Sequence, residues 1–348
     1  MLSGELFALS VLTVFIFVLL TFLLGYLLIR KARENRSRKR IKQYKENYKA
    51  SVYDYLVTGD SSRLLRPSGK ERKLAIEELL SDFSNVLEGE DEKKNLSNYA
   101  TLYLTETYRS YLKSRQWSKR MNTLFLIEDL YMDGLAEDVK KNIVDHPRVT
   151  KEEVVQALSI LARFKNSELY YYIDLKSEQL LEFDLRTILR RVEDDEFNVF
   201  LDNFKKEAPA LQYAVVEKIG NSKDIESISF LESIYQEYKG EIKIRALKAI
   251  VKIGYVNDIT DYLPLCESSS WQERMLVARL LKIEQDQRSQ NCLKKLLHDE
   301  SWWVRSQAGE SLASFQDGFE ILTTITQESQ DAYARDMANE WLNKGVIT

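Results

Sequence analysis

Four arginines in the C-terminal part of the chain recur at an almost constant interval. Arg245, Arg274, Arg305 and Arg335 follow one another at spacings of 29, 31 and 30 residues. Each is followed, three or four residues later, by a small side chain that would let one helix approach another closely. These are Ala249, Ala278, Ala308 with Gly309, and Ala338. A fixed period of this length predicts a fold built from stacked, similar units.

A second motif supports the repeat. Trp-x-x-Arg occurs three times, ending at Arg120, Arg274 and Arg305, and the first two copies are 154 residues apart. That separation is close to five repeats of 31 residues. Weaker copies fit between them, at residues 154–164, 184–191 and 211–220. The repeat is therefore predicted to begin near residue 115.

The pattern between these motifs is helical. Apolar residues recur at intervals of three and four rather than two, and the chain has only 4 prolines and 12 glycines in 348 residues. Ser68 and Thr150 are each followed three residues later by a glutamate, Glu71 and Glu153. This spacing is typical of a capping box, in which the two side chains bind free amides at a helix start. An all-α fold is predicted.

The repeated pattern resembles that of HEAT repeats, in particular the short bacterial HEAT-like kind. Asp299, Val304, Arg305, Ala308 and Leu312 carry the resemblance. It is good from about residue 205 to 345, modest from 115 to 204, and absent before about 60. It implies a right-handed α-solenoid of helical hairpins with an extended concave surface.

The resemblance also implies a role for two charged residues. Arg305 and Asp299 are expected to join adjacent units by a charge-assisted hydrogen bond, for which the planar arginine fork is suited. The sequence departs from the family pattern nearby: Glu300 stands where proline is usual, and the equivalents of Asp299 in the two preceding units are Ser268 and Lys239. The ladder of such pairs is therefore not expected to be unbroken.

The N-terminal part is of a different kind. Leu6–Ile29 is an uncharged apolar run of 24 residues. At about 1.5 Å per residue, a helix of this length exceeds the roughly 30 Å hydrocarbon core of a bilayer. The five residues before the run hold no Lys or Arg and the run is longer than that of a signal peptide. We expect a membrane anchor that is retained.

A basic segment follows the apolar run. Residues 30–49 hold ten Lys or Arg and two Glu. By the positive-inside tendency, this predicts a single-pass protein of the cell membrane with its N-terminus outside and its C-terminal domain cytoplasmic. Anionic lipid headgroups are expected to bind residues 30–49. A topology signal without specific lipid recognition is the simpler alternative.

The remainder, residues 50–348, is acidic, with 40 Lys or Arg and 51 Asp or Glu. This balance argues against nucleic acid as a partner, because binding to phosphates needs a basic surface. Cys266 and Cys292 are the only cysteines. Since the cytosol keeps thiols reduced, we expect no disulfide and a packing role for both.

These patterns divide the chain into four parts. Whether residues 41–66 continue the anchor helix or begin the solenoid is left open. The predicted parts are a transmembrane anchor at 1–29, a basic juxtamembrane helix or linker at 30–66, a helical N-terminal cap region at 67–114, and a HEAT-like repeat solenoid at 115–348.

The tryptophans and arginines of the repeat are candidates for partner binding. Trp and Arg are the residue types most often found as interface hot spots, although packing between repeats is the simpler explanation. Consecutive helical residues point about 100° apart, so one of Trp302 and Trp303 is expected to pack between units and the other to be exposed. The candidates are Trp271, Arg274, Trp302, Trp303, Arg305 and Tyr171, the last from a run of three tyrosines.

No pattern predicts catalysis, and no cofactor is expected. The two histidines, His146 and His298, lack a second ligand at metal-binding spacing. The acidic run 193–196 is more typical of a solvated helix start than of a metal site. The nearest two glycines, Gly309 and Gly318, are nine residues apart, which excludes the glycine-rich phosphate loops.

The sequence therefore predicts a membrane-tethered cytoplasmic HEAT-repeat scaffold or adaptor rather than an enzyme. Its expected partner is a membrane-associated protein at the inner membrane face, for example in an envelope or glycosyl-transfer assembly. Two alternatives stay open. The first is a HEAT-like enzyme such as a bilin lyase-type protein, because families that resemble this pattern include bilin lyases and DNA-repair glycosylases. The second is a passive structural link between membrane and cytoplasm.

Overall fold

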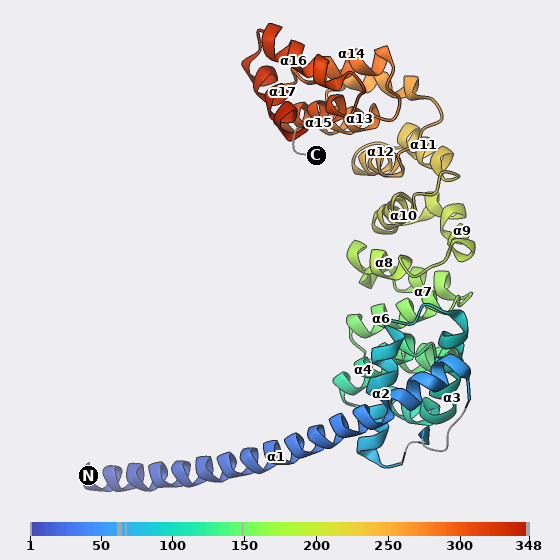
Figure 1. Cartoon of the computed structure of the whole chain (residues 1–348). Helices are drawn as coiled ribbons and strands as arrows, with labels where there is room; N and C mark the ends of the chain where they lie inside the picture. The colour runs from blue at the N-terminus through green and yellow to red at the C-terminus, as the bar shows by residue number, and fades with distance from the viewer. Residues whose placement is uncertain (1, 61–64, 67, 148, 346–348) are drawn as a thin grey trace. The chain divides into compact units, whose positions relative to one another are not determined.

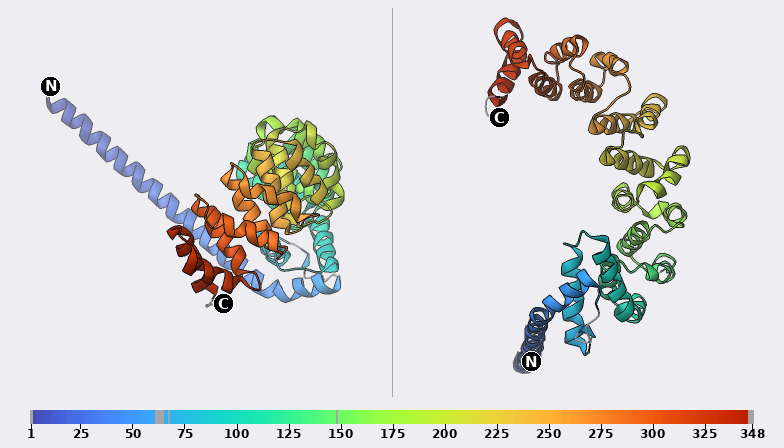
Figure 2. Two further views of the ribbon diagram at one scale, coloured as in Figure 1. Left: turned by 90° about the horizontal axis from the view of Figure 1, so that it is seen from above. Right: turned by 45° about the vertical axis from the view of Figure 1, so that its right-hand side comes forward.

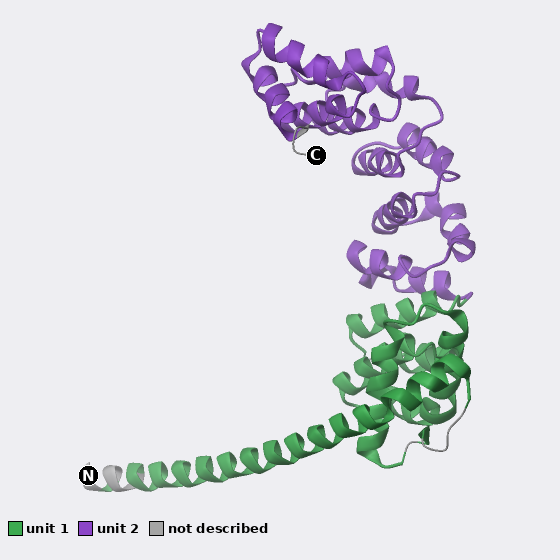
Figure 3. Cartoon of the chain, viewed as in Figure 1, with its two compact units in different colours: residues 1–166 green, residues 167–348 purple. Residues whose placement is uncertain are grey.

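The structure is a computed structural model that describes residues 2–60, 65–66, 68–147 and 149–345. Regular secondary structure in these residues is helical throughout, which confirms the predicted all-α class. The chain divides into two compact units, Met1–Asn166 and Ser167–Thr348 (Figure 3).

Helix α1 (Leu2–Thr58) is one continuous helix of 57 residues. Its N-terminal part extends away from the rest of unit 1, and the apolar side chains described there are exposed (Figure 1). Among the described residues, α1 is the one helix long and apolar enough to cross a membrane. Residues 41–58 belong to the same helix, so the described part of the juxtamembrane segment up to Thr58 continues the anchor helix.

The C-terminal part of α1 is also part of the core of unit 1. Ile41, Val52 and Leu56 are buried where α1 packs on α2 (Lys70–Ser84) and α3 (Glu90–Leu112). One helix therefore carries the apolar run at one end and core residues at the other.

The rest of unit 1 continues with helices that pack in chain order, α3 on α4 and α4 on α6. Polar contacts lie inside this core: the Tyr108 hydroxyl donates to Glu77 at 2.6 Å, and both side chains are buried. The elements are α4 (Trp117–Asp129), η2 (Asp133–Leu135), α5 (Ala136–Val139), the single π turn η3 (Lys140–Val144) and α6 (Lys151–Arg163).

One predicted capping box is confirmed and the other is wrong. At the start of α6, the Thr150 hydroxyl accepts from the amide of Glu153, and the Glu153 carboxylate accepts from the amide of Thr150. At the start of α2, the N-cap is Gly69 with φ +79°, and the Ser68 hydroxyl accepts from Arg72 instead. The glycine turns the chain so that Ser68 lies one residue before the cap.

Unit 2 contains two sets of helices. Helices of the first set pack on one another in chain order, α8 on α10, α10 on α12, α12 on α13, α13 on α15 and α15 on α17. Helices of the second set pack on their neighbours in the first, as α11 does on α12 and α16 on α17 (Figures 1 and 2). The bounds are α7 (Leu169–Leu175), η4 (Ser177–Gln179), α8 (Glu182–Leu189), α9 (Asp194–Asp202), η5 (Phe204–Lys206), α10 (Pro209–Ser222), α11 (Ile228–Glu237), α12 (Glu241–Ile253), η6 (Ile259–Glu267), α13 (Trp271–Leu280), α14 (Gln287–Leu296), α15 (Trp302–Ala313), α16 (Gly318–Glu328) and α17 (Ala332–Gly345).

The small residues of the repeat lie where first-set helices meet. Ala278, Ala308 and Ala338 are fully buried. At the α10–α12 contact, a Cβ atom added to Gly220 would lie 3.0 Å from the backbone of Ala249. The close approach predicted from the spacing is therefore present, and it leaves no room for larger side chains.

Four arginines of the repeat make the same local contact in the two units. Each guanidinium donates from Nη1, at 2.7–2.8 Å, to the backbone carbonyl six residues earlier. The side chain of that earlier residue accepts, in turn, from the backbone amide two residues after it. The pairs are Arg120 with Ser114, Arg274 with Ser268, Arg305 with Asp299, and Arg335 with Ser329. We call this contact the arginine turn; it fixes the entry of each helix.

The ion pair expected between Arg305 and Asp299 is not formed. The Asp299 carboxylate accepts two hydrogen bonds from Arg274, at 2.5 and 2.9 Å, whereas Arg305 binds only the backbone carbonyls of Asp299 and Glu300. The ion pair that links two adjacent repeats of unit 2 therefore runs from the arginine of one repeat to the acid of the next. Arg120 and Glu153 form the same two-pronged contact in unit 1.

The two cysteines are joined, contrary to the expectation of free thiols. Cys266 in η6 and Cys292 in α14 form a disulfide with their Cα atoms 6.1 Å apart. The pairing arises because η6 and α14 pack side by side, next to α13.

Candidate functional site

The first-set helices of unit 2 carry a groove that we take as the candidate site. It has a cavity of about 530 Å³ over α8, α10, α12 and the start of α13. A second cavity, of about 410 Å³ over α8 and α10, shares Arg186 and Glu217 with it. We call the two together the α8–α13 groove.

The carboxylates of the groove are all engaged by two arginines. Arg186 binds Glu217 at 2.9 Å and lies 3.5 Å from Glu182. Arg245 binds Glu182 at 2.5 Å and Glu241 at 2.7 Å. Because Glu182 and Arg245 are 63 residues apart in sequence, this network also holds α8 and α12 at a fixed separation.

Four further cations line the groove. Lys248 and Lys252 lie one turn apart on α12 and are exposed, as is Arg190 at the end of α8. Lys218 donates to the carbonyl of Val192 and has a carboxylate no nearer than 4.0 Å. Burial lowers the pKa of Lys218, against the opposing attraction of Asp194. The positive charge of the groove thus exceeds its negative charge.

Aromatic rings lie beside these charges. Phe183 is 70% exposed and Trp271 is 39% exposed, both on the lining of the groove. The guanidinium of Arg245 lies over the ring of Tyr213, 4.4 Å from its centroid. An arrangement of exposed rings between cations suits a ligand that carries both apolar and negatively charged groups.

The predicted site residues do not gather in one place. Trp271 is in the groove, but Arg274 is buried in its contact with Asp299 and serves the arginine turn. Trp302 and Trp303 begin α15 and are 47% and 59% exposed, with their rings in edge-to-face contact. The expectation that one of them packs between units is wrong, because both precede the buried face that starts at Val304.

The two remaining candidates are also outside the groove. Arg305 is half-buried, with its guanidinium over the ring of Tyr333 and its Nε bound to no other described group. Tyr171 is 59% exposed on α7, while its neighbours Tyr170 and Tyr172 contact Phe200 and the core. Neither side chain is among the residues that line the α8–α13 groove.

Several groove residues were not predicted, among them Phe183, Arg190, Lys248 and Lys252. They belong to helices whose mutual placement no short motif reports. The weak repeat copies at 184–191 and 211–220 were the available signal, since both fall on first-set helices, α8 and α10.

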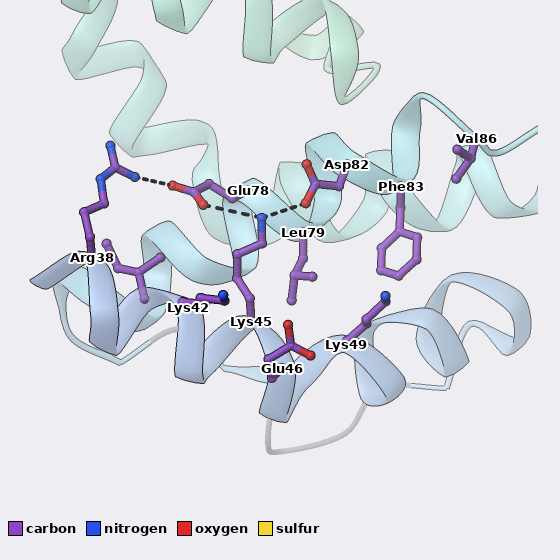
Figure 4. A pocket seen from close by; sticks show the side chains of 11 residues that line it. Arg38, Lys42, Lys45, Glu46, Lys49, Glu78, Leu79, Asp82, Phe83 and Val86 are labelled. Atoms are coloured by element: carbon purple, nitrogen blue, oxygen red, sulfur yellow. Dashed lines mark hydrogen bonds and ion pairs between the residues drawn. The ribbon is translucent and has the colours of Figure 1, made fainter. Parts of the chain in front are cut away.

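A further cavity, of about 600 Å³, lies in unit 1 between α1 and α2 (Figure 4). Lys45 binds Asp82 at 2.6 Å and lies 3.5 Å from Glu78, and Arg38 binds Glu78 at 2.8 Å. Burial lowers the pKa of Lys45, but the bonds to Asp82 and the attraction of both acids outweigh it and raise the pKa overall. Part of the basic segment is therefore committed to holding α1 against α2.

Within the described residues, no group of three or more His, Cys, Asp or Glu could hold a metal ion. His298 follows α14, and its ring nitrogens lie 2.9 Å from the carbonyl of Lys294 and 3.0 Å from the hydroxyl of Ser329. The acidic run 193–196 forms the start of α9.

Comparisons with known proteins identify no family. No family model matches the chain, and no curated protein matches it. Among solved structures, it is similar to a crystal structure of an engineered protein at 13% identity, covering 90% of this chain and 99% of that one with a TM-score of 0.36. A second engineered protein matches at 17% identity over 70% of this chain and 96% of that one, with a TM-score of 0.21.

Proposed function

We propose that this chain is a membrane-anchored scaffold whose helical pairs form a HEAT-like α-solenoid and bind a protein partner at the inner face of the cell membrane. The observation that carries the proposal is the continuity of α1, whose apolar end is exposed and whose other end is buried in the core of unit 1. Anchor and folded part share one rigid element. Binding, rather than catalysis, is the proposed activity.

The continuous helix sets the distance of the folded part from the bilayer. Ile29 ends the apolar run, and Arg38 is the first residue of α1 with a bond to α2. Nine residues at 1.5 Å each place these two positions about 13 Å apart along the helix. A partner held by unit 1 or unit 2 is thus confined near the membrane, which raises its effective concentration there.

The basic segment is proposed to have two roles. Arg38, Arg40 and Lys45 bind acids of α2. By contrast, Arg30, Lys31, Arg33 and Arg36 are exposed and closest to the apolar run, with no carboxylate bound among the described residues. The first group fastens α1 to the fold; the second is available to anionic headgroups, at roughly 1 kcal/mol per residue.

The orientation rests on the charge asymmetry around the apolar run. The disulfide between Cys266 and Cys292 points the other way, because such bonds persist in oxidising compartments. We favour the cytoplasmic orientation, since ten basic residues adjoin the run on one side. In the reducing cytosol, both thiols are then expected to be free, so a membrane-impermeant maleimide should label them only after the cells are permeabilised, and without added reductant. Labelling of intact cells, or labelling that requires a reductant, would contradict the cytoplasmic orientation.

The scaffold function is tested by site-specific photocrosslinking in intact membranes. A photoreactive amino acid at Trp271 should trap a protein partner, and the same group at exposed Arg279, near the other end of α13 and outside the groove lining, serves as the control. A chain without residues 1–29 should lose the crosslink and the membrane fraction together. Equal trapping at both positions, or none at any exposed position of unit 2, would contradict the proposal.

A further inference from the structure

We infer that the α8–α13 groove binds an extended, acidic segment of a partner protein that carries an apolar or aromatic side chain. This inference rests on the proposed scaffold function and specifies the chemistry of its partner. It follows from three features of the groove: the unequal pairing of its charges, the spacing of its lysines, and its exposed rings.

Charge is distributed unevenly in unit 2. Residues 167–348 hold 22 Lys or Arg and 32 Asp or Glu, a formal charge of −10. The groove lining reverses this sign, since six cations face three carboxylates. Arg186 and Arg245 engage all three carboxylates. Arg190, Lys218, Lys248 and Lys252 have none of these carboxylates at hydrogen-bonding distance, and Lys252 donates to the uncharged side chain of Asn221. A negatively charged ligand is complementary to this patch, although unit 2 as a whole is acidic.

The spacing of the lysines fits an extended polypeptide. Lys248 and Lys252 are four residues apart on α12, and a helix rises 1.5 Å per residue, so they lie about 6 Å apart along the axis. In an extended chain, side chains on one face recur every second residue, about 6.6 Å apart. Acidic residues at alternate positions can therefore meet both lysines, while the residues between them point to the opposite side of the peptide.

The exposed aromatic rings of the groove set a second requirement for its ligand. Phe183 and Trp271 lie at opposite ends of the lining sequence, on α8 and α13, and both are exposed. A purely ionic ligand would leave these rings in water. A peptide side chain that covers one of them gains about 25 cal/mol per Å² of apolar area buried. Nucleic acid is disfavoured, because the phosphates flanking the groove would face a surface of like charge.

Fluorescence anisotropy on the full chain in detergent micelles tests the inference. The probe is a fluorescein-labelled peptide that alternates glutamate with polar residues and has one central phenylalanine. We expect saturable binding that weakens as salt is added, and loss of binding when glutamine replaces the glutamates. Equal binding of the glutamine peptide, or preferential binding of a labelled single-stranded oligonucleotide, would overturn the inference.

A charge-reversed variant locates the binding. The double substitution Lys248→Glu, Lys252→Glu should lower the affinity for the acidic peptide by about tenfold or more. Lys282→Glu with Lys344→Glu makes the same change in net charge at exposed positions outside the groove and should leave affinity nearly unchanged. Circular dichroism and the thermal midpoint of each variant report whether the fold is intact. Equal weakening by both variants would show a general charge effect and reject the groove as the site.

The crosslinking and peptide experiments separate the two proposals. If a partner is still trapped at Trp271 in the Lys248→Glu, Lys252→Glu variant, the scaffold function stands and the acidic-segment inference fails. If the peptide binds as expected but no partner is trapped in membranes, the groove chemistry stands and the scaffold function fails.

Discussion

The starts of α13 and α15 share a sequence motif, but only α13 has an additional ion pair and a disulfide beside it. Arg274 and Arg305 both follow a tryptophan by three residues and both complete an arginine turn. Arg274 also binds the carboxylate of Asp299 in the next pair, and the elements flanking α13 are joined by the Cys266–Cys292 bond. At the position equivalent to Asp299, the pair after Arg305 has Ser329, whose carbonyl binds Arg335.

The two helix starts separate the contacts that recur in the repeat from those that occur at only one of them. The arginine turn and the buried alanine recur at both places, so the backbone geometry and the close helix contact define the unit. The ion pair and the disulfide are local additions around α13. Each repeat therefore fixes the start of its own helix, whereas the contact between neighbouring repeats varies in strength along the chain.

The largest effect is expected when the reinforced link is broken. Arg274→Ala would leave Asp299 buried without its cation, and loss of one partner of a buried pair costs about 3–5 kcal/mol. Chemical denaturation monitored by circular dichroism measures the change. Arg279→Ala, exposed on the same helix, is the control and should cost little. A change at Arg274 no larger than the control's would show that the link adds nothing.

The next effect concerns the covalent connection. Cys266 and Cys292 are 26 residues apart, and a disulfide that closes a loop of that length stabilises the fold by about 3.5 kcal/mol, because it restricts the unfolded chain. Cys292→Ser should lower the thermal midpoint of oxidised protein and leave that of protein kept in dithiothreitol almost unchanged. A similar loss under both conditions would assign the effect to packing and not to the bond.

A smaller gain is expected if the weaker link is given the missing acid. Ser329→Asp would offer a carboxylate to Arg305, as Asp299 does to Arg274, and should stabilise by about 1 kcal/mol because the pair is half-exposed. The gain should vanish in an Arg305→Ala background, which a double-mutant cycle measures. Persistence of the gain in that background would mean that the introduced carboxylate acts through another group, such as His298, whose ring lies beside the Ser329 hydroxyl.

The smallest effect is a contrast in pH dependence between two buried carboxylates, Glu77, which is hydrogen-bonded to Tyr108, and Glu153, which is hydrogen-bonded to Arg120. Burial raises the pKa of Glu77, although its bond from Tyr108 opposes this, so its contribution to stability is lost as pH rises through the folded pKa. Burial would also raise the pKa of Glu153, but Arg120 and the cap outweigh it and lower the pKa, so its contribution is lost as pH falls through the folded pKa. Glu77→Gln and Glu153→Gln should therefore change the slope of stability against pH in opposite directions, and slopes of one sign would contradict this assignment.

The sequence predicted the helical class, the apolar helix and the positions of the repeated arginines, because each follows from a short-range period. It mispaired Asp299, since the resemblance supplied the residue types but not which neighbour each would face. The arginine turn was missed because the side chains at its first position differ in type. Ser114, Ser268 and Ser329 carry a hydroxyl and Asp299 a carboxylate, yet each accepts a hydrogen bond from the backbone amide two residues later.

The groove was beyond local patterns. Trp271 was predicted from its motif, but its companions Phe183 and Lys248 come from helices whose separation is set by contacts such as Arg245 with Glu182, 63 residues apart. No periodicity in a single helix reports which of its exposed residues share a surface with another. The cysteines show the same limit, because their proximity depends on how η6 and α14 pack.

The unbroken course of α1 has a mechanical consequence. A helix advances 100° per residue, so one residue inserted between Ile29 and Arg38 would swivel unit 1 by that angle about the helix axis and lift it by about 1.5 Å. Conversely, a tilt or rotation of the apolar end in the bilayer would be transmitted directly to the folded part of unit 1, because no flexible joint interrupts the helix.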